Sequence, residues 1–238
     1  FDAAMAEFLN SMKSRPDDYA SHYNLGNFFS GQGKVDPAMN AYETAVKLNP
    51  TFAAPLVNAS LLLNREGRNE DAEKALLRAL EIEPDSAPAH FNFGLLLAET
   101  GRLGEAEKAL RKSLELDPAL AAAAFNLGIL LGQQGKSEGI DWCAKAFALE
   151  PATAKYGYTY AFFLLQTSAV DRAVEILESL VEGGHATADV YGLLGQIHEQ
   201  QRNVEKARAV YKQAGGDFNL DERERAAFSE RLNRLPEQ

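Results

Sequence analysis

Four asparagines recur along the chain at a constant interval of 34 residues, and their side chains are the first candidates for a chemical role. They are Asn24, Asn58, Asn92 and Asn126. An asparagine amide offers one acceptor oxygen and two donor hydrogens. A row of such amides could hydrogen-bond the backbone of an extended peptide without selecting its side chains. The alternative is that the asparagines stabilise the fold.

Large apolar residues accompany the asparagines at the same interval. The position before each asparagine, continued through the later repeats, holds Tyr23, Val57, Phe91, Phe125, Tyr158 and Gly192, and the third position after it holds Asn27, Leu61, Leu95, Ile129, Phe162 and Gln196. An exposed apolar strip of this kind usually marks a contact site, whereas the alternative is that these side chains pack into neighbouring helices. The candidate peptide-binding residues are therefore Asn24, Asn58, Asn92, Asn126, Tyr23, Asn27, Phe91, Phe125, Tyr158 and Phe162.

Residues that could carry catalysis or hold a metal lack the necessary spacing. The four histidines, His22, His90, His185 and His198, form no His-x-x-x-His or Cys-x-x-Cys-His arrangement. The single cysteine, Cys143, has no fitting base nearby in the sequence, and a buried, inert thiol is expected. The glycines form no phosphate-binding loop. We expect no catalytic residues, no metal site and no cofactor.

Prolines show which elements must position the candidate residues. Pro16, Pro50, Pro84 and Pro118 are each 34 residues apart, and Pro151 follows after 33. With this proline numbered as position 32 of a repeat, the asparagines fall at position 6. Proline ends a helix because it lacks the backbone donor and restricts the residue before it.

Small residues and glycines recur within the same repeat. Position 8 holds Gly26, Ser60, Gly94, Gly128, Ala161 and Gly195, and position 15 holds Gly33, Gly67, Gly101 and Gly135, followed by Ser168 and Arg202. A small residue at position 8 lets two helices approach closely, and glycine at position 15 can end the first helix in a left-handed conformation. Each repeat is thus predicted to be a helix, a turn and a second helix, stacked on its neighbours.

This pattern resembles the tetratricopeptide repeat family, and the stretch YASHYNLGNFFSGQGKVDPAMNAYETAVKLNP (residues 19–50) matches it along its whole length. The resemblance implies an all-α fold, a right-handed α-solenoid of stacked antiparallel helix hairpins. It also implies a concave groove lined by the first helices, where the asparagines resemble the asparagine ladder of some peptide-binding members. The expected partner is a protein or peptide segment, extended or helical, with apolar anchors.

The repeat predicts the organisation of the whole chain. Residues 1–18 are expected to be the second helix of a truncated repeat, so the native chain is expected to extend upstream. Residues 19–214 are expected to form six units, and residues 215–238 a linker and a capping helix. The predicted units are residues 19–52, 53–86, 87–120, 121–153, 154–187 and 188–214. Asp221 is the expected N-cap of the capping helix.

Composition limits the classes of partner. The formal net charge is −10 with no block of basic residues, which argues against nucleic acid. No apolar run approaches the ~18 residues of a spanning helix, so no membrane insertion is expected. One cysteine fits a reducing compartment without proving it, so the location, cytoplasmic or periplasmic, stays open.

Two functions of different classes follow from these observations. The first is a peptide-binding module, without enzymatic activity of its own. The second is a scaffold, which assembles by self-association or by packing against another part of its own protein. The stretch AKYGYTYAFFLLQTSAVDRAVEILESL (residues 154–180) is similar to the C-terminal repeat region of bacterial multihaem cytochrome c proteins. That resemblance implies a periplasmic location and docking beside an electron-transfer domain.

Overall fold

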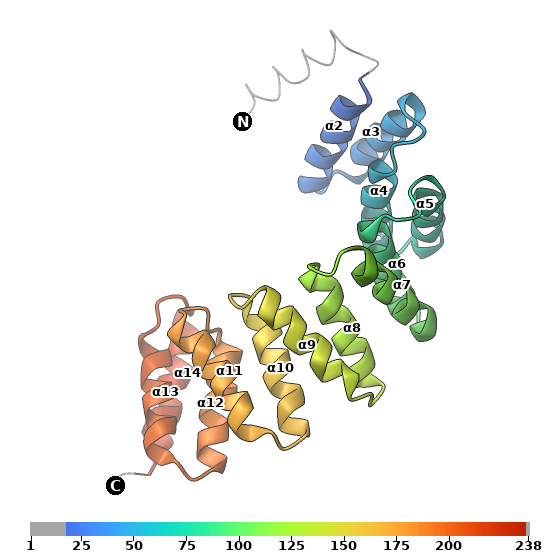
Figure 1. The fold of residues 1–238 in the computed structure, drawn as a ribbon. Helices are drawn as coiled ribbons and strands as arrows, with labels where there is room; N and C mark the ends of the chain where they lie inside the picture. Colours follow the sequence, from blue (N-terminus) through green and yellow to red (C-terminus); the bar gives the residue numbers. More distant parts are fainter. Residues whose placement is uncertain (1–17, 237–238) are drawn as a thin grey trace. The chain divides into compact units, whose positions relative to one another are not determined.

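The computed structural model describes residues 18–236, which contain helices and no strands. Backbone contacts divide the chain into two units, unit 1 (Phe1–Pro118) and unit 2 (Ala119–Gln238). The prediction for residues 1–18 lies outside the described residues except for Asp18, which is the N-cap of the first described helix. Figure 1 shows consecutive helices paired as antiparallel hairpins in each unit.

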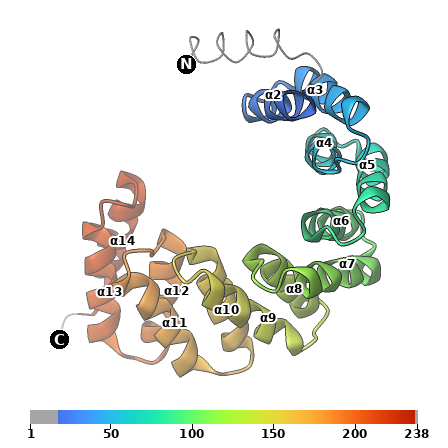
Figure 2. The same ribbon diagram turned by 45° about the horizontal axis from the view of Figure 1, so that its top comes forward.

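The described residues of unit 1 form three hairpins. Their helices are α2 (Tyr19–Gly31), α3 (Val35–Leu48), α4 (Ala54–Arg65), α5 (Asn69–Ile82), α6 (Ala87–Glu99) and α7 (Leu103–Leu116). Within the unit, α2 pairs with α3, α4 with α5 and α6 with α7, while the first helices α2, α4 and α6 also contact one another in order (Figure 2). The first-helix face therefore brings position 6 of successive repeats onto neighbouring helices.

Unit 2 contains three hairpins and one further helix. Its helices are α8 (Ala121–Gln133), α9 (Glu138–Leu149), α10 (Ala154–Gln166), α11 (Val170–Glu182), α12 (Ala188–Gln200), α13 (Val204–Gly216) and α14 (Glu222–Arg234). The helix α14 packs on α13. The expected all-α fold of stacked helix hairpins is confirmed for the described part of the chain.

The turns inside the hairpins have the left-handed conformation that the sequence predicts. Gly33, Gly67, Gly101 and Gly135 all have positive φ angles between 69° and 79°. Ser168 and Arg202 occupy the same turn with φ angles of 61° and 59°. The last two turns therefore keep the hairpin geometry without glycine, at a cost of roughly 1–2 kcal/mol each.

Small residues at position 8 allow the two helices of a hairpin to approach closely. A Cβ atom on Gly128 would lie 2.6 Å from the Cys143 Sγ atom and 2.9 Å from the Cys143 backbone nitrogen. Ala38, Ala72, Ala106 and Ala173, on the facing second helices, are completely buried. These contacts, and not sequence propensity alone, hold the hairpins closed.

The helix α14 covers the end of the apolar core of unit 2. The Phe228 ring is 5% exposed and stacks on the Tyr211 ring, with centroids 6.0 Å apart. A capping box starts the helix: the Asp221 side chain accepts from the Glu224 backbone nitrogen (2.8 Å), and the Glu224 side chain accepts from the Asp221 backbone nitrogen (2.9 Å). The expected N-cap at Asp221 is thus confirmed. The helix α14 has one apolar face toward the core and one polar face exposed to solvent.

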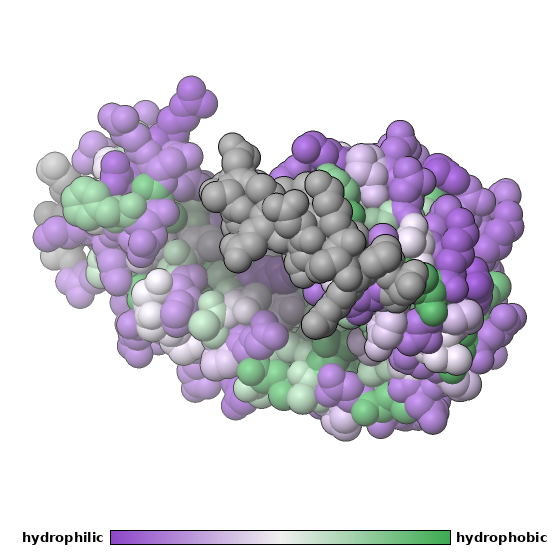
Figure 3. Space-filling view, turned by 90° about the horizontal axis from the view of Figure 1, so that it is seen from above, coloured by the Kyte–Doolittle hydropathy of each residue, from purple (hydrophilic) through white to green (hydrophobic). Residues whose placement is uncertain are grey.

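Hydrophilic side chains dominate the face of the molecule in Figure 3, where hydrophobic residues form separate patches. The most exposed large apolar side chain among the described residues is Phe218, which is 90% exposed between α13 and α14. The Arg225 guanidinium lies 5.0 Å from the centroid of its ring. No helix among residues 18–236 is long and apolar enough to cross a membrane.

Candidate functional site

The asparagines of position 6 lie on the first helices, but they do not share one environment. Asn24 is exposed on α2, whereas Asn58, Asn92 and Asn126 are half-buried on α4, α6 and α8. Three of them belong to unit 1, and Asn126 belongs to unit 2. The hydrogen bonds of the four asparagine side chains differ accordingly.

Asn58 takes part in a polar cluster between α2, α3 and α4. Its Nδ2 atom donates to the Asn27 Oδ1 atom (2.7 Å) and to the Tyr23 hydroxyl (3.1 Å). The Tyr42 hydroxyl donates to the same Asn27 oxygen at 2.8 Å. Both donor hydrogens of the Asn58 amide are therefore engaged inside unit 1, so Asn58, Asn27 and Tyr23 stabilise the stacking of neighbouring helices.

The other three asparagines have fewer internal partners. The Asn126 Nδ2 atom donates to the Ala122 backbone oxygen of its own helix at 2.7 Å. The side chains of Asn24 and Asn92 have no hydrogen-bond partner in the structure that describes residues 18–236. Of these two, Asn24 is exposed and Asn92 is half-buried.

The candidate aromatic residues also differ in exposure. Phe125 is 8% exposed and packs on Tyr156 with ring centroids 4.6 Å apart, so it contributes little to the surface strip expected from the sequence. Phe91 and Tyr158 are half-buried. Phe162 is 45% exposed and is the most accessible of the candidate aromatic side chains.

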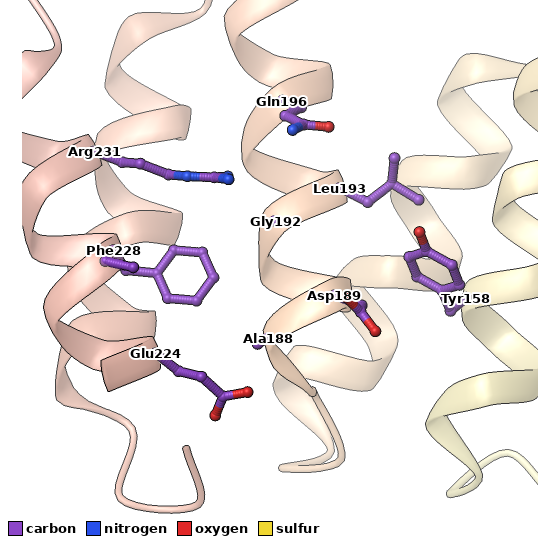
Figure 4. Close-up of a pocket in the computed structure, with 10 residues that line it drawn as sticks. Tyr158, Ala188, Asp189, Gly192, Leu193, Gln196, Glu224, Phe228 and Arg231 are labelled. Carbon is purple, nitrogen blue, oxygen red and sulfur yellow. The ribbon is translucent and has the colours of Figure 1, made fainter. Parts of the chain in front are cut away.

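A pocket of about 310 Å³ lies on the first-helix face of unit 2 (Figure 4). Residues of α12 form one wall: Ala188, Asp189, Gly192, Leu193 and Gln196. The other walls come from α14, which supplies Glu224, Ala227, Phe228 and Arg231, and from α10, which supplies Tyr158. The α12 residues occupy positions 1, 2, 5, 6 and 9 of the repeat, so the pocket opens on the face where the repeat predicts a ligand.

Gly192 creates the space for this pocket. Position 5 carries a larger apolar or aromatic side chain in each of the five earlier repeats, from Tyr23 to Tyr158. A Cβ atom on Gly192 would meet a single atom within 4 Å, the Arg231 Nη1 atom at 3.8 Å. The missing side chain leaves a gap between α12 and α14, at the level between Asp189 and Gln196 along α12.

The charged groups of the pocket lie at its two ends. Figure 4 shows Asp189 and Glu224 at one end, where α12 and α14 begin, and Arg231 and Gln196 at the other. The Arg231 guanidinium lies 5.7 Å from the Phe228 ring centroid and 5.9 Å from that of Tyr211. Within the described residues, no carboxylate forms an ion pair with Arg231, and no cation pairs with Asp189 or Glu224.

Buried polar groups surround the pocket without opening into it. The Tyr211 hydroxyl donates to Glu199, and burial together with this acceptor raises the pKa of Tyr211 to about 12. The Tyr191 hydroxyl donates to Asp217 at 2.9 Å, and burial raises its pKa to about 12 as well. Both tyrosines stay neutral at physiological pH, and neither of them lines the pocket.

A second pocket, of about 320 Å³, lies in unit 1 between α3, α4 and α5. Its walls are mainly apolar and include Met39, Val46, Leu56 and Leu63. It is lined chiefly by residues of the second helices α3 and α5 and by packing positions of α4, so it contains none of the candidate peptide-binding residues.

Cys143 and the histidines show no catalytic arrangement. Cys143 is completely buried, and burial raises the pKa of its thiol to about 12. His198 is also buried, with its Nε2 atom 4.0 Å from the Glu178 Oε1 atom. Among residues 18–236 there is no group of three or more His, Cys, Asp or Glu side chains that could hold a metal ion.

Comparisons with known families agree with the helical repeat. Models described as tetratricopeptide repeat match residues 19–52, residues 51–119, and residues 91–154 together with 164–218. The chain belongs to the tetratricopeptide repeat family. A search of curated proteins found no match.

Several solved structures share the fold. PilF of Pseudomonas aeruginosa matches with a TM-score of 0.72 and 18% identity, covering 90% of this chain and 97% of that one. MamA of Desulfovibrio magneticus RS-1 matches at 0.58 and 21% identity, covering 69% and 93%. YrrB, described as a repeat protein with an unusual peptide-binding site, matches at 0.56 and 19% identity, covering 74% and 91%.

These similarities establish the fold alone, because the sequences are less than 25% identical. They do not show the similarity of residues 154–180 to multihaem cytochrome c proteins. That similarity, and the periplasmic location that it implies, stay predictions.

Sequence reasoning missed the pocket as a site. Of its lining residues, Tyr158 alone was a candidate. The available signal was the glycine at position 5 of the last repeat, where every earlier repeat has a larger side chain. Its significance depends on Phe228 and Arg231, which lie on α14, outside the repeat pattern.

Proposed function

We infer that this protein is an interaction module that binds a segment of a partner protein on the first-helix face of unit 2. The observation that carries this proposal is the pocket at Gly192, where aromatic side chains meet charged side chains that form no ion pair within the described residues. Its volume is at the lower end of the range of ligand pockets, which suits one or two side chains of a peptide. Phe162, 45% exposed on the neighbouring α10, offers a further apolar contact beside it.

A displayed library of random twelve-residue peptides tests the proposal. Peptides selected on the wild-type protein are measured by calorimetry against the wild type and against Gly192→Phe. The substitution places at position 5 the same side chain that Phe91 and Phe125 supply in other repeats, and the added Cβ atom has room. The new ring fills the pocket, so peptide binding should weaken by at least about tenfold, the loss of an anchor worth roughly 1.4 kcal/mol.

Gly104→Phe is the matched control. Gly104 lies in the first turn of α7 in unit 1, where an added Cβ atom meets nothing within 4 Å. Selected peptides should bind this variant as tightly as they bind the wild type. The proposal fails if no peptide is selected, or if every selected peptide binds Gly192→Phe with unchanged affinity.

The scaffold alternative predicts a different result in solution. Light scattering over a concentration series gives the mass of the purified chain, for which the monomer is 26.0 kDa. A monomer leaves the pocket free for a foreign segment. A tight dimer that Gly192→Phe dissociates would instead identify a second copy as the occupant and favour self-association.

A further inference from the structure

We propose that the pocket of unit 2 selects an extended peptide segment with a basic and an acidic side chain four residues apart and an apolar residue midway between them. The proposal rests on the proposed function, since it assigns the chemistry of the ligand that the same pocket binds. Three observations lead to it: the separation of opposite charges, the absence of ion-pair partners for them within the described residues, and the apolar side chains between them.

The two ends of the pocket have opposite polarity. Glu224 and Arg231 lie seven residues apart on α14, which is about 10 Å along a helix axis. Asp189 and Gln196 have the same separation on α12, and Figure 4 shows the two carboxylates at one end. The pocket therefore offers carboxylates to a cation at one end, and a guanidinium and an amide to an anion at the other.

No ion pair within residues 18–236 neutralises these charges. The Arg231 side chain rests on the faces of Phe228 and Tyr211, and within residues 18–236 it forms no ion pair. The Glu224 Oε2 atom accepts the capping hydrogen bond from Asp221, which leaves its second oxygen for a ligand. Asp189 is exposed in the first turn of α12 without a cation partner in the described residues. A ligand with one sign of charge would satisfy one end only and be repelled at the other.

The middle of the pocket accepts an apolar side chain. Gly192 lies between Phe228 and Leu193 in Figure 4, so apolar side chains flank it on both sides, and the Arg231 Nη1 atom lies 3.8 Å from the position of an added Cβ atom. In an extended peptide, side chains on one side of the backbone recur every second residue, about 7 Å apart. Residues i and i+4 thus span about 13 Å, and flexible basic and acidic side chains can lean inward to charged residues whose positions on α14 are about 10 Å apart.

Four short peptides of equal length test the charge pattern. Each contains the core X-Ala-Leu-Ala-Z, and each is acetylated and amidated so that only side chains supply charge. The pairs at X and Z are Lys and Glu, Lys and Lys, Glu and Glu, and Gln and Gln. The Lys/Glu peptide should bind the wild type about two- to fivefold more tightly than the neutral peptide for each rim pair formed, and this advantage should shrink with added salt.

A single substitution should reverse the preference. Arg231→Glu makes both ends of the pocket acidic, so the Lys/Lys peptide should become the tightest of the four. Arg231→Lys keeps the charge and should leave the original order unchanged. Circular dichroism of both variants checks that the helices are retained, since Arg231 also touches aromatic rings.

The outcomes separate this inference from the function on which it rests. Equal affinities of the four peptides, no measurable binding by any of them, or an unchanged order with Arg231→Glu would each overturn the charge pattern. If library peptides still bind and are still displaced by Gly192→Phe, the pocket remains an interaction site with a different ligand chemistry. If neither the library nor the four peptides yield binding, both proposals are wrong.

Discussion

The close approach of α8 and α9 predicts that Gly128→Ala destabilises unit 2, although alanine favours a helix over glycine. The added Cβ atom would lie 2.6 Å from the Cys143 Sγ atom, 2.9 Å from the Cys143 backbone nitrogen and 3.0 Å from the Gly139 backbone oxygen. Two of these atoms belong to the backbone, so a side-chain rotation cannot relieve the contact and the helices must separate. Overpacking of this kind costs about 1–3 kcal/mol, and the helix propensity of alanine returns roughly 1 kcal/mol.

The expected net loss is up to about 2 kcal/mol in the free energy of unfolding, measured by urea denaturation followed by circular dichroism. Cys143 supplies a local probe, because it is the only cysteine of the chain and is completely buried. Its reaction with a disulfide reagent requires opening of the α8–α9 hairpin, so the labelling rate should rise up to about tenfold for each 1.4 kcal/mol lost.

Gly104→Ala is the control for this experiment, because its added Cβ atom meets nothing within 4 Å. Its free energy of unfolding should be unchanged or higher by up to about 1 kcal/mol. If Gly128→Ala is as stable as the wild type and labels no faster, the helices are not held at the distance that the structure gives, and the reasoning is wrong.

Two further predictions concern unit 2. Burial lowers the pKa of His198, with the nearby Lys206 adding to the effect, so its contribution to stability is present above the unfolded value of about 6.5 and is lost as pH falls through the folded value. The difference in unfolding free energy between the wild type and His198→Leu should therefore shift against the wild type between pH 7 and pH 5 in parallel urea titrations; a pH-independent difference would contradict this. Asp221→Ala removes the side-chain acceptor of the α14 capping box and should cost about 1 kcal/mol. Hydrogen exchange of the α14 amides should become faster, while exchange elsewhere in unit 2 stays unchanged. Protection of α14 equal to that of the wild type would show that the cap does not hold this helix.

The fold could be predicted from the sequence because each repeat specifies it independently and with the same devices. Proline at position 32 and glycine at position 15 end helices for backbone reasons that need no knowledge of the partner helix. The structure confirms the left-handed turn even at Ser168 and Arg202, where glycine is missing. There the packing of the helices on both sides imposes a conformation that the local sequence disfavours.

The candidate site was less predictable because exposure depends on contacts between repeats. Asn58 and Asn126 occupy the same position of their repeats. Asn58 donates to Tyr23 and Asn27 on another helix, whereas Asn126 donates within its own helix. Phe125 is buried by Tyr156, which comes from the next hairpin. A repeat position fixes the face of a helix, while the neighbouring side chains decide whether that face reaches solvent.

Under the proposed function, recognition lies in the departures from the repeat. Asn58 keeps the residue that recurs at its position, and both of its donor hydrogens are used inside the fold. Gly192 departs from its position and has no packing role, since its Cβ direction is open. Directly opposite lies α14, which follows no repeat and brings Arg231 and Phe228 to the gap. This glycine and this arginine have no counterpart in the earlier repeats, so under the proposed function the pocket would distinguish ligands in a way that a surface of equivalent repeats would not.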